Sequence, residues 1–176
     1  MSRRVLVSND DGLHGPGLRP LIRELRPLGR VVVVVPEQER SATGHSITLH
    51  KPLRIRLVEK DFYTLNGTPA DCVRFGIAAL LKGRVDAVVS GINRGENMGE
   101  DTLYSGTVGA AMEGCLFNVP SVAVSLSRPR DGHYATAARF ARKMVKRILE
   151  SPPPPGLCLN VNVPDRPTKS LRGAAV

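Results

Sequence analysis

Five consecutive valines, residues 31–35, are the feature that most restricts how this chain of 176 residues can fold. A run of β-branched residues with no polar member predicts a strand buried on both faces, as the strands of a parallel sheet are. Residues 5–8 form another short apolar run, and residues 18–28, between the two runs, have the pattern of a helix. A strand, a helix and a second strand in this order predict a right-handed βαβ unit.

The rest of the chain continues this alternation. Further strands are predicted at residues 85–90, 119–125 and 157–163, and further helices at residues 68–82, 108–117 and 134–149. Residues 47–63 contain two more segments of strand character, which indicate a β excursion. We therefore expect a single α/β domain over residues 1–176, Rossmann-like, with three α/β/α layers built on a mainly parallel sheet.

The charge of the chain points to an anionic ligand. Its formal net charge is +9, which predicts attraction to phosphates, nucleotides, nucleic acid or acidic membrane surfaces. Part of this excess lies in residues 139–147 at a spacing typical of the solvated face of a helix. Only 4% of the residues are aromatic, which argues against the base-stacking platforms of nucleic-acid-binding proteins. No segment has transmembrane length, and we expect a soluble cytoplasmic protein that binds no membrane.

A pair of carboxylates follows the first predicted strand, at the edge where open α/β sheets bind their ligands. Gly12 ends this strand in a turn, so the side chains of Asp10 and Asp11 are able to converge. Two adjacent carboxylates favour magnesium, manganese or calcium, and Ser41 and Asn93 in later loops offer further oxygen ligands. The alternative is a helix cap with a solvated acid beside it.

A run of small residues, Ser105-Gly106-Thr107, begins a predicted helix. Its N–H groups and hydroxyls are able to approach an anion at the positive end of the helix dipole, although an ordinary helix cap has the same pattern. Together with the acidic pair it predicts a phosphoryl site. His45 and His14 are weaker candidates for proton transfer, because a histidine in a polar loop more often serves as a hydrogen-bonding residue.

Two common nucleotide-binding motifs are absent from the sequence. No G-x-G-x-x-G follows the first strand, and no G-x-x-x-x-G-K-[ST] segment is present. These absences argue against dinucleotide binding and against hydrolysis by a P-loop enzyme.

Five segments resemble the stationary-phase survival protein SurE family, in that family's order. They are residues 5–12 (VLVSNDDG), 39–48 (ERSATGHSIT), 66–73 (NGTPADCV), 89–99 (VSGINRGENMG) and 104–114 (YSGTVGAAMEG). The resemblance extends over nearly the whole chain. It implies a divalent-metal-dependent 5′/3′-nucleotidase, a phosphatase that hydrolyses nucleoside monophosphates to nucleoside and phosphate.

The resemblance also implies a set of site residues. One Mn²⁺ or Mg²⁺ ion per subunit is expected at the metal ligands Asp10, Asp11, Ser41 and Asn93. The residues expected at the phosphate are Asn9, Asn97, Ser105, Gly106 and Thr107, and those expected to be catalytic are Asp10, Asp11 and Asn97. Nucleoside monophosphates are the expected partners, with short polyphosphate as a further candidate and no specific nucleic acid.

Members of the family usually continue well beyond the segment that matches residues 160–165, whereas this chain ends at Val176. The further part resembles an extended C-terminal region used in assembly. We expect that extension to be absent from this chain, and we expect a homodimer or homotetramer.

Several functional interpretations follow from the sequence. The leading one is hydrolysis by a metal-activated water. In the second, Asp10 or Asp11 is a phosphoryl-accepting nucleophile, as in haloacid-dehalogenase-like phosphatases. The others are a basic nucleic-acid-binding module and a nucleotide sensor that binds without turnover.

Overall fold

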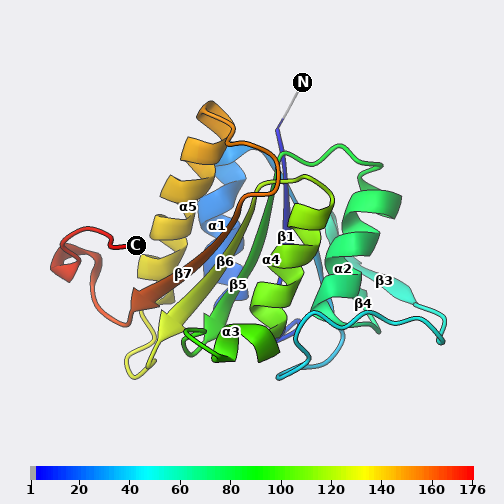
Figure 1. Ribbon diagram of the computed structural model, residues 1–176, viewed down its shortest axis with the longest axis horizontal. Helices are drawn as coiled ribbons and strands as arrows, with labels where there is room; N and C mark the ends of the chain where they lie inside the picture. The colour runs from blue at the N-terminus through cyan, green and yellow to red at the C-terminus, as the bar shows by residue number, and fades with distance from the viewer. Residues whose placement is uncertain (1–2) are drawn as a thin grey trace.

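The computed structural model describes residues 3–176, which fold around a seven-stranded sheet with the order β3-β4-β2-β1-β5-β6-β7 (Figure 1). The strands are β1 (Arg4–Ser8), β2 (Arg30–Pro36), β3 (Ile55–Glu59), β4 (Phe62–Leu65), β5 (Ala87–Arg94), β6 (Ser121–Ser127) and β7 (Cys158–Pro164). β3 pairs antiparallel with β4, and the other neighbouring pairs are parallel. The prediction of a mainly parallel sheet is confirmed.

Helices cover both faces of this sheet (Figure 1). On one face α1 (Leu18–Leu25) packs against α5 (Tyr134–Glu150), and on the other α2 (Pro69–Phe75) packs against α4 (Gly106–Leu116). The shorter elements are α3 (Asp101–Tyr104), the 3-10 turns η1 (Arg26–Leu28) and η3 (Thr168–Ser170), and η2 (Gly76–Leu80), a π-helical continuation of α2. The expected α/β/α layers are present.

The five valines bury both faces of β2, as their sequence predicts. Val33 and Val35 belong to the core beneath α1 and α5, whereas Val32 and Val34 belong to the core beneath α2 and α4. Each of these four side chains is at most 3% exposed. Burial of one valine stabilises a fold by roughly 1.5–3 kcal/mol. The valines of β2 therefore stabilise the packing of both helical layers on the sheet.

β5 is longer than its sequence indicates, because the predicted loop over residues 91–103 begins as strand. β5 continues to Arg94, and its pairing with β6 is irregular between Gly91 and Asn93. A Cβ atom at Gly91, where φ is +131°, would lie 2.3 Å from the carbonyl oxygen of Val124. Only glycine permits this close approach. Gly91 therefore belongs to β5, although glycine in a sequence usually indicates a loop. Asn93 is therefore held by the sheet.

The other predicted boundaries need smaller corrections. The helix expected over residues 18–28 ends at Leu25 and continues as η1, because Pro27 has no N–H to donate. The strand segments expected within residues 47–63 correspond to β3 and β4, although β4 continues to Leu65; β3 is the antiparallel excursion at the sheet edge. Over residues 3–176, no helix combines the length and hydrophobicity needed to span a bilayer.

Candidate active site

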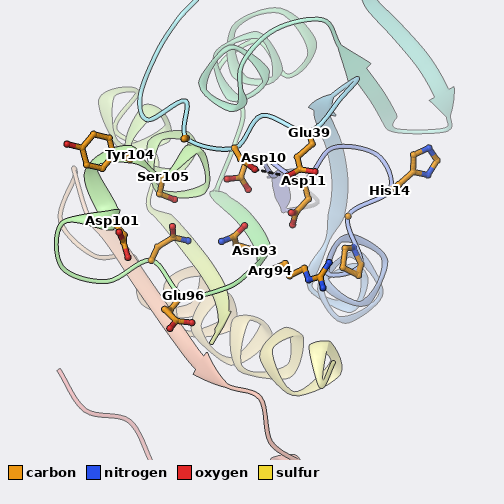
Figure 2. Close-up of a pocket in the computed structure, with 15 residues that line it drawn as sticks. Asp10, Asp11, His14, Glu39, Asn93, Arg94, Glu96, Asp101, Tyr104 and Ser105 are labelled. Carbon is orange, nitrogen blue, oxygen red and sulfur yellow. Dashed lines mark hydrogen bonds between the residues drawn. The ribbon is translucent and has the colours of Figure 1, made fainter. Parts of the chain in front are cut away.

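Loops at the carboxyl ends of the parallel strands enclose a cleft of about 500 Å³ (Figure 2). They follow β1, β2 and β5, and the segment joining α3 to α4 completes the wall. Of the residues predicted for the site, those that line the cleft are Asp10, Asp11, Ser41, Asn93, Asn97 and Ser105. The other three, Asn9, Gly106 and Thr107, do not line it.

Asp10 is tied to the start of α4. Its side chain accepts the hydroxyl hydrogen of Thr107 at Oδ1, at 2.5 Å, and the Thr107 main-chain N–H at Oδ2, at 3.2 Å. Gly106 permits this approach, since a Cβ atom there would lie 3.0 Å from Asp10 Cβ. Burial raises the pKa of Asp10, and the hydrogen bonds from Thr107 oppose that effect. The helix start therefore holds one carboxylate in place.

Asp11 has less support than Asp10, from a main-chain hydrogen bond and the charge of Arg94. Its Oδ2 atom is buried and has no hydrogen-bond partner among the residues that the structure describes. Burial, followed by the negative charges of Asp10 and Glu39, raises the pKa of Asp11 to about 6, against the opposing effect of Arg94. A buried carboxylate oxygen without a partner is costly, and a cation between Asp10 and Asp11 would satisfy it. The acidic pair therefore fits a divalent ion.

The other two predicted metal ligands also face the cleft. Asn93 donates from Nδ2 to the carbonyl oxygen of Gly95 at 3.0 Å, which leaves its amide oxygen for a ligand. Ser41 is exposed, and its hydroxyl donates to Glu39 Oε1 at 2.7 Å. Figure 2 shows the side chains of Asp10, Asp11 and Asn93 near one another in the cleft. These donors are all oxygen atoms, the type that magnesium and manganese prefer.

The residues predicted at the phosphate make specific contacts within the protein. Asn9 exchanges two hydrogen bonds with the main chain of Gly12, at 2.9 and 3.1 Å. Ser105 caps α4 by accepting the main-chain N–H of Val108 at 3.1 Å. Asn97 donates its side-chain N–H to Ser125 at 2.8 Å and is 7% exposed. Asn97 and Ser105 thus reach the cleft, whereas Asn9 supports the turn after β1.

The cleft also contains residues for which the sequence reasoning assigned no role. Glu39 and Arg94 line it beside the acidic pair, and Tyr104 lies at the α3 side of the cleft (Figure 2). Arg94 lies between two predicted site residues, Asn93 and Asn97, and this position in the sequence could have indicated that it lines the cleft. Glu39 gave no comparable signal, because a charged residue in a polar loop is usually a solvated one.

The two histidine candidates have different positions. His14 lines the cleft. His45 does not line it and instead places Nε2 2.7 Å from Oε2 of Glu113, a residue of α4 whose side chain is 1% exposed. Glu113 also accepts from Arg74 of α2 at 2.8 Å. The structure therefore favours His45 as the residue that fastens the Ser41 loop to α4.

A second acidic group lies away from the cleft. Ligand atoms of Asp131, His133 and Asp165 are within 4.8 Å of one another. Asp165 already accepts four main-chain N–H groups from residues 130–133, which lower its pKa below the ordinary range despite the opposing effect of burial. This arrangement fixes the loop before α5.

The fold and the cleft define an α/β protein with a carboxylate-lined site at the carboxyl ends of parallel strands. The sequence model of the family described as Survival protein SurE matches residues 5–176. The chain belongs to that family.

Individual SurE proteins agree with this assignment. 5′-Nucleotidase SurE of Geobacter metallireducens is 51% identical over 174 residues, which are 98% of this chain and 69% of the relative. The protein of the same name from Methylobacillus flagellatus is 49% identical over 98% of this chain and 70% of its own length. The crystal structure of the SurE protein of Aquifex aeolicus superposes with a TM-score of 0.93 at 42% identity, covering 98% of this chain and 70% of that one.

Proposed function

We propose that this chain is a divalent-metal-dependent phosphatase that hydrolyses nucleoside 5′-monophosphates, and also 3′-monophosphates, to nucleoside and phosphate. One observation carries the proposal: Asp10 and Asp11 are adjacent in a cleft, and Asp11 Oδ2 is buried with no hydrogen-bond partner within residues 3–176. Relatives about half identical to the chain carry the name 5′-nucleotidase, which supports this substrate class.

Asp10, Asp11, Ser41 and Asn93 would hold one Mn²⁺ or Mg²⁺ ion per subunit. When bound, such an ion supplies a water activated for attack on phosphorus and part of the charge that balances the phosphoryl oxygens. The chain contributes the geometry: Thr107 fixes Asp10, and the end of β5 carries Asn93. These two supports keep ligands from distant parts of the sequence at one place.

Asn97 and Ser105 are proposed to bind the phosphoryl group from the other wall of the cleft. An amide nitrogen carries two hydrogens, so Asn97 keeps one for substrate while it donates the other to Ser125. The positive end of the α4 dipole lies beside Ser105 and favours negative charge there, although the N–H groups of Thr107 and Val108 already bond to Asp10 and Ser105. Phosphate contacts from Asn9, Gly106 and Thr107 stay a prediction, because these residues do not line the cleft.

The charge of the cleft favours a small terminal monoester. Five carboxylates line it, from Asp10, Asp11, Glu39, Glu96 and Asp101. A long nucleic-acid backbone would be repelled by this wall, whereas a mononucleotide or a short polyphosphate exposes a terminal group that reaches the metal. We also propose, on the family resemblance, a homodimer or homotetramer located in the cytoplasm.

The basic face of α5 gives little support to a nucleic-acid-binding role. Arg139 and Arg142 both pair with Glu24 of α1, and Lys146 pairs with Glu150. The two pairs with Glu24 connect the helix to α1, and all three pairs reduce the free positive charge that a phosphate backbone would need. Arg139, Arg142 and Lys146 therefore contribute to the fold rather than to a free basic surface.

Product analysis tests this proposal against its alternatives. The chain should release phosphate and nucleoside from AMP and GMP in the presence of Mn²⁺ and leave internal phosphodiesters of RNA intact. Binding of AMP without release of phosphate would identify a sensor instead. Trapping of an acyl-phosphate on Asp10 or Asp11 would identify a nucleophile mechanism.

A further inference from the structure

Asn97 is held in the cleft by the edge strand of the sheet, far away in sequence. The main-chain N–H of Asn97 donates to Asn162 Oδ1 at 2.8 Å, and Asn162 Nδ2 donates back to the Asn97 carbonyl oxygen at 3.0 Å. Asn160 donates to the same carbonyl oxygen at 2.7 Å. The side chain of Asn162 therefore engages both main-chain polar groups of Asn97.

This arrangement follows from the strand register. Asn160 and Asn162 are two residues apart in β7, so their side chains project to the same face. Asn162 is paired with Ser125 of β6, and Ser125 is paired with Asn93 of β5. One row across three neighbouring strands (Figure 1) thus contains a proposed metal ligand, the partner of the Asn97 side chain and the partner of its main chain.

The segment that carries Asn97 crosses the ends of these strands. Gly95 donates its N–H to the carbonyl oxygen of Leu126, and Glu96 accepts the N–H of Arg128. Both contacts attach the segment to β6 and the loop after it. At Asn97 the main-chain N–H and carbonyl oxygen are bonded by side chains of β7 instead of by a neighbouring strand.

We infer that Asn162 is a positioning residue for Asn97, with Asn160 in a secondary role. This inference rests on the proposed function, in which Asn97 binds the phosphoryl group. Asn162 does not line the cleft, so it acts by fixing where the Asn97 amide points. A catalytic group displaced by about 1 Å costs on the order of 10²-fold in rate, so the effect should be measurable in turnover.

The test compares four single variants and one double variant of the whole chain: Asn97→Ala, Asn160→Ala, Asn162→Ala, Asn162→Asp and Asn97→Ala with Asn162→Ala. Three quantities are measured for each: kcat for AMP under Mn²⁺, the Mn²⁺ dissociation constant, and hydrogen exchange at the Asn97 main-chain amide. Hydrogen exchange reports the hydrogen bond from the Asn97 N–H to Asn162 even if the chain does not hydrolyse AMP.

Asn162→Ala should lower kcat about 10- to 100-fold, expose the Asn97 amide to exchange and leave Mn²⁺ affinity within about threefold of wild type. Asn162→Asp keeps the acceptor and should keep the amide protected, and Asn160→Ala should keep it protected as well. The double variant should be no slower than Asn97→Ala, because Asn162 acts through Asn97.

Other results would overturn the inference. One is an Asn162→Ala variant that keeps the wild-type kcat or keeps its Asn97 amide protected. Another is a double variant whose loss in kcat equals the product of the two single losses, as expected for two independent sites. A wild-type chain that releases no phosphate from AMP contradicts the proposed function instead. In that case amide exchange alone decides whether Asn162 holds Asn97. Loss of protection in the two variants that carry Asn162→Ala, and in no other, is the supporting result.

Discussion

Thr107 donates two hydrogen bonds to the carboxylate of Asp10, one from its hydroxyl at 2.5 Å and one from its main-chain N–H at 3.2 Å. Thr107 is fully buried, so these contacts are shielded from water. A residue predicted from sequence to bind phosphate thus holds a proposed metal ligand. Such supporting contacts orient a ligand and typically account for about 10- to 100-fold in metal affinity.

Thr107→Val should therefore weaken Mn²⁺ binding about 10- to 100-fold, since valine has a similar shape and no hydroxyl. Thr107→Ser keeps the hydroxyl and should bind Mn²⁺ within about threefold of wild type. Isothermal titration of the metal-free chain with Mn²⁺ measures both. If Thr107→Val binds Mn²⁺ normally and loses only turnover, Thr107 contacts the phosphate as the sequence predicted.

The acidic pair should make the stability of the metal-free chain depend on pH. The pKa of Asp11 is about 6 in the folded chain, above its ordinary value of 3.8, and the pKa of Asp10 is raised as well. The folded chain therefore binds these protons more tightly than the unfolded chain. Their contribution is fully present below pH 4 and is lost as the pH rises through about 6.

In EDTA the free energy of unfolding should thus fall by on the order of 1–2 kcal/mol between pH 5 and pH 7, a value discounted because Asp11 is partly exposed. Urea unfolding at a series of pH values measures it. Asp165 and Asp61, whose pKa values are lowered, act in the opposite direction at lower pH. An Asp11→Asn variant with the same slope as wild type would contradict this account.

Glu113 should contribute to stability through the loop that carries Ser41. Glu113→Ala removes the buried carboxylate that both His45 and Arg74 contact and should destabilise the chain by about 1–3 kcal/mol. Arg74→Ala is the matched control, because the arginine is 55% exposed, and it should cost about 1 kcal/mol or less. Equal losses in the two variants would show that the His45 contact adds nothing.

The sequence predicts the layers of this fold well, for reasons visible in particular residues. The valines of β2 specify a strand buried on both faces. An N-cap residue at Thr68, a proline at the next position and an acid in the first turn at Asp71 mark the start of α2. The end of β5 was not predictable, because Gly91 and Gly95 resemble a loop in sequence, whereas Gly91 belongs to an irregular strand. Local patterns do not report the close backbone approach that requires glycine there.

The sequence predicts those site residues that are neighbours on one loop. It does not predict the long-range contacts that position them. Asp10 and Asp11 are neighbours after a strand, so their convergence follows from topology. The contact between Thr107 and Asp10 joins residues 97 positions apart, and the contact between Asn97 and Asn162 joins residues 65 positions apart. No spacing in the sequence encodes either contact.

Asp10 and Asp11 are proposed to form a metal-dependent phosphatase site. The most direct measurement is phosphate release from AMP, for wild type and Asp11→Asn, in EDTA and after addition of excess Mn²⁺ or Mg²⁺. Wild type should be inactive in EDTA and recover with metal, whereas folded Asp11→Asn should lose at least about 10- to 100-fold of the metal-restored rate. Undiminished hydrolysis by wild type in excess EDTA, or by Asp11→Asn with metal, would contradict the account.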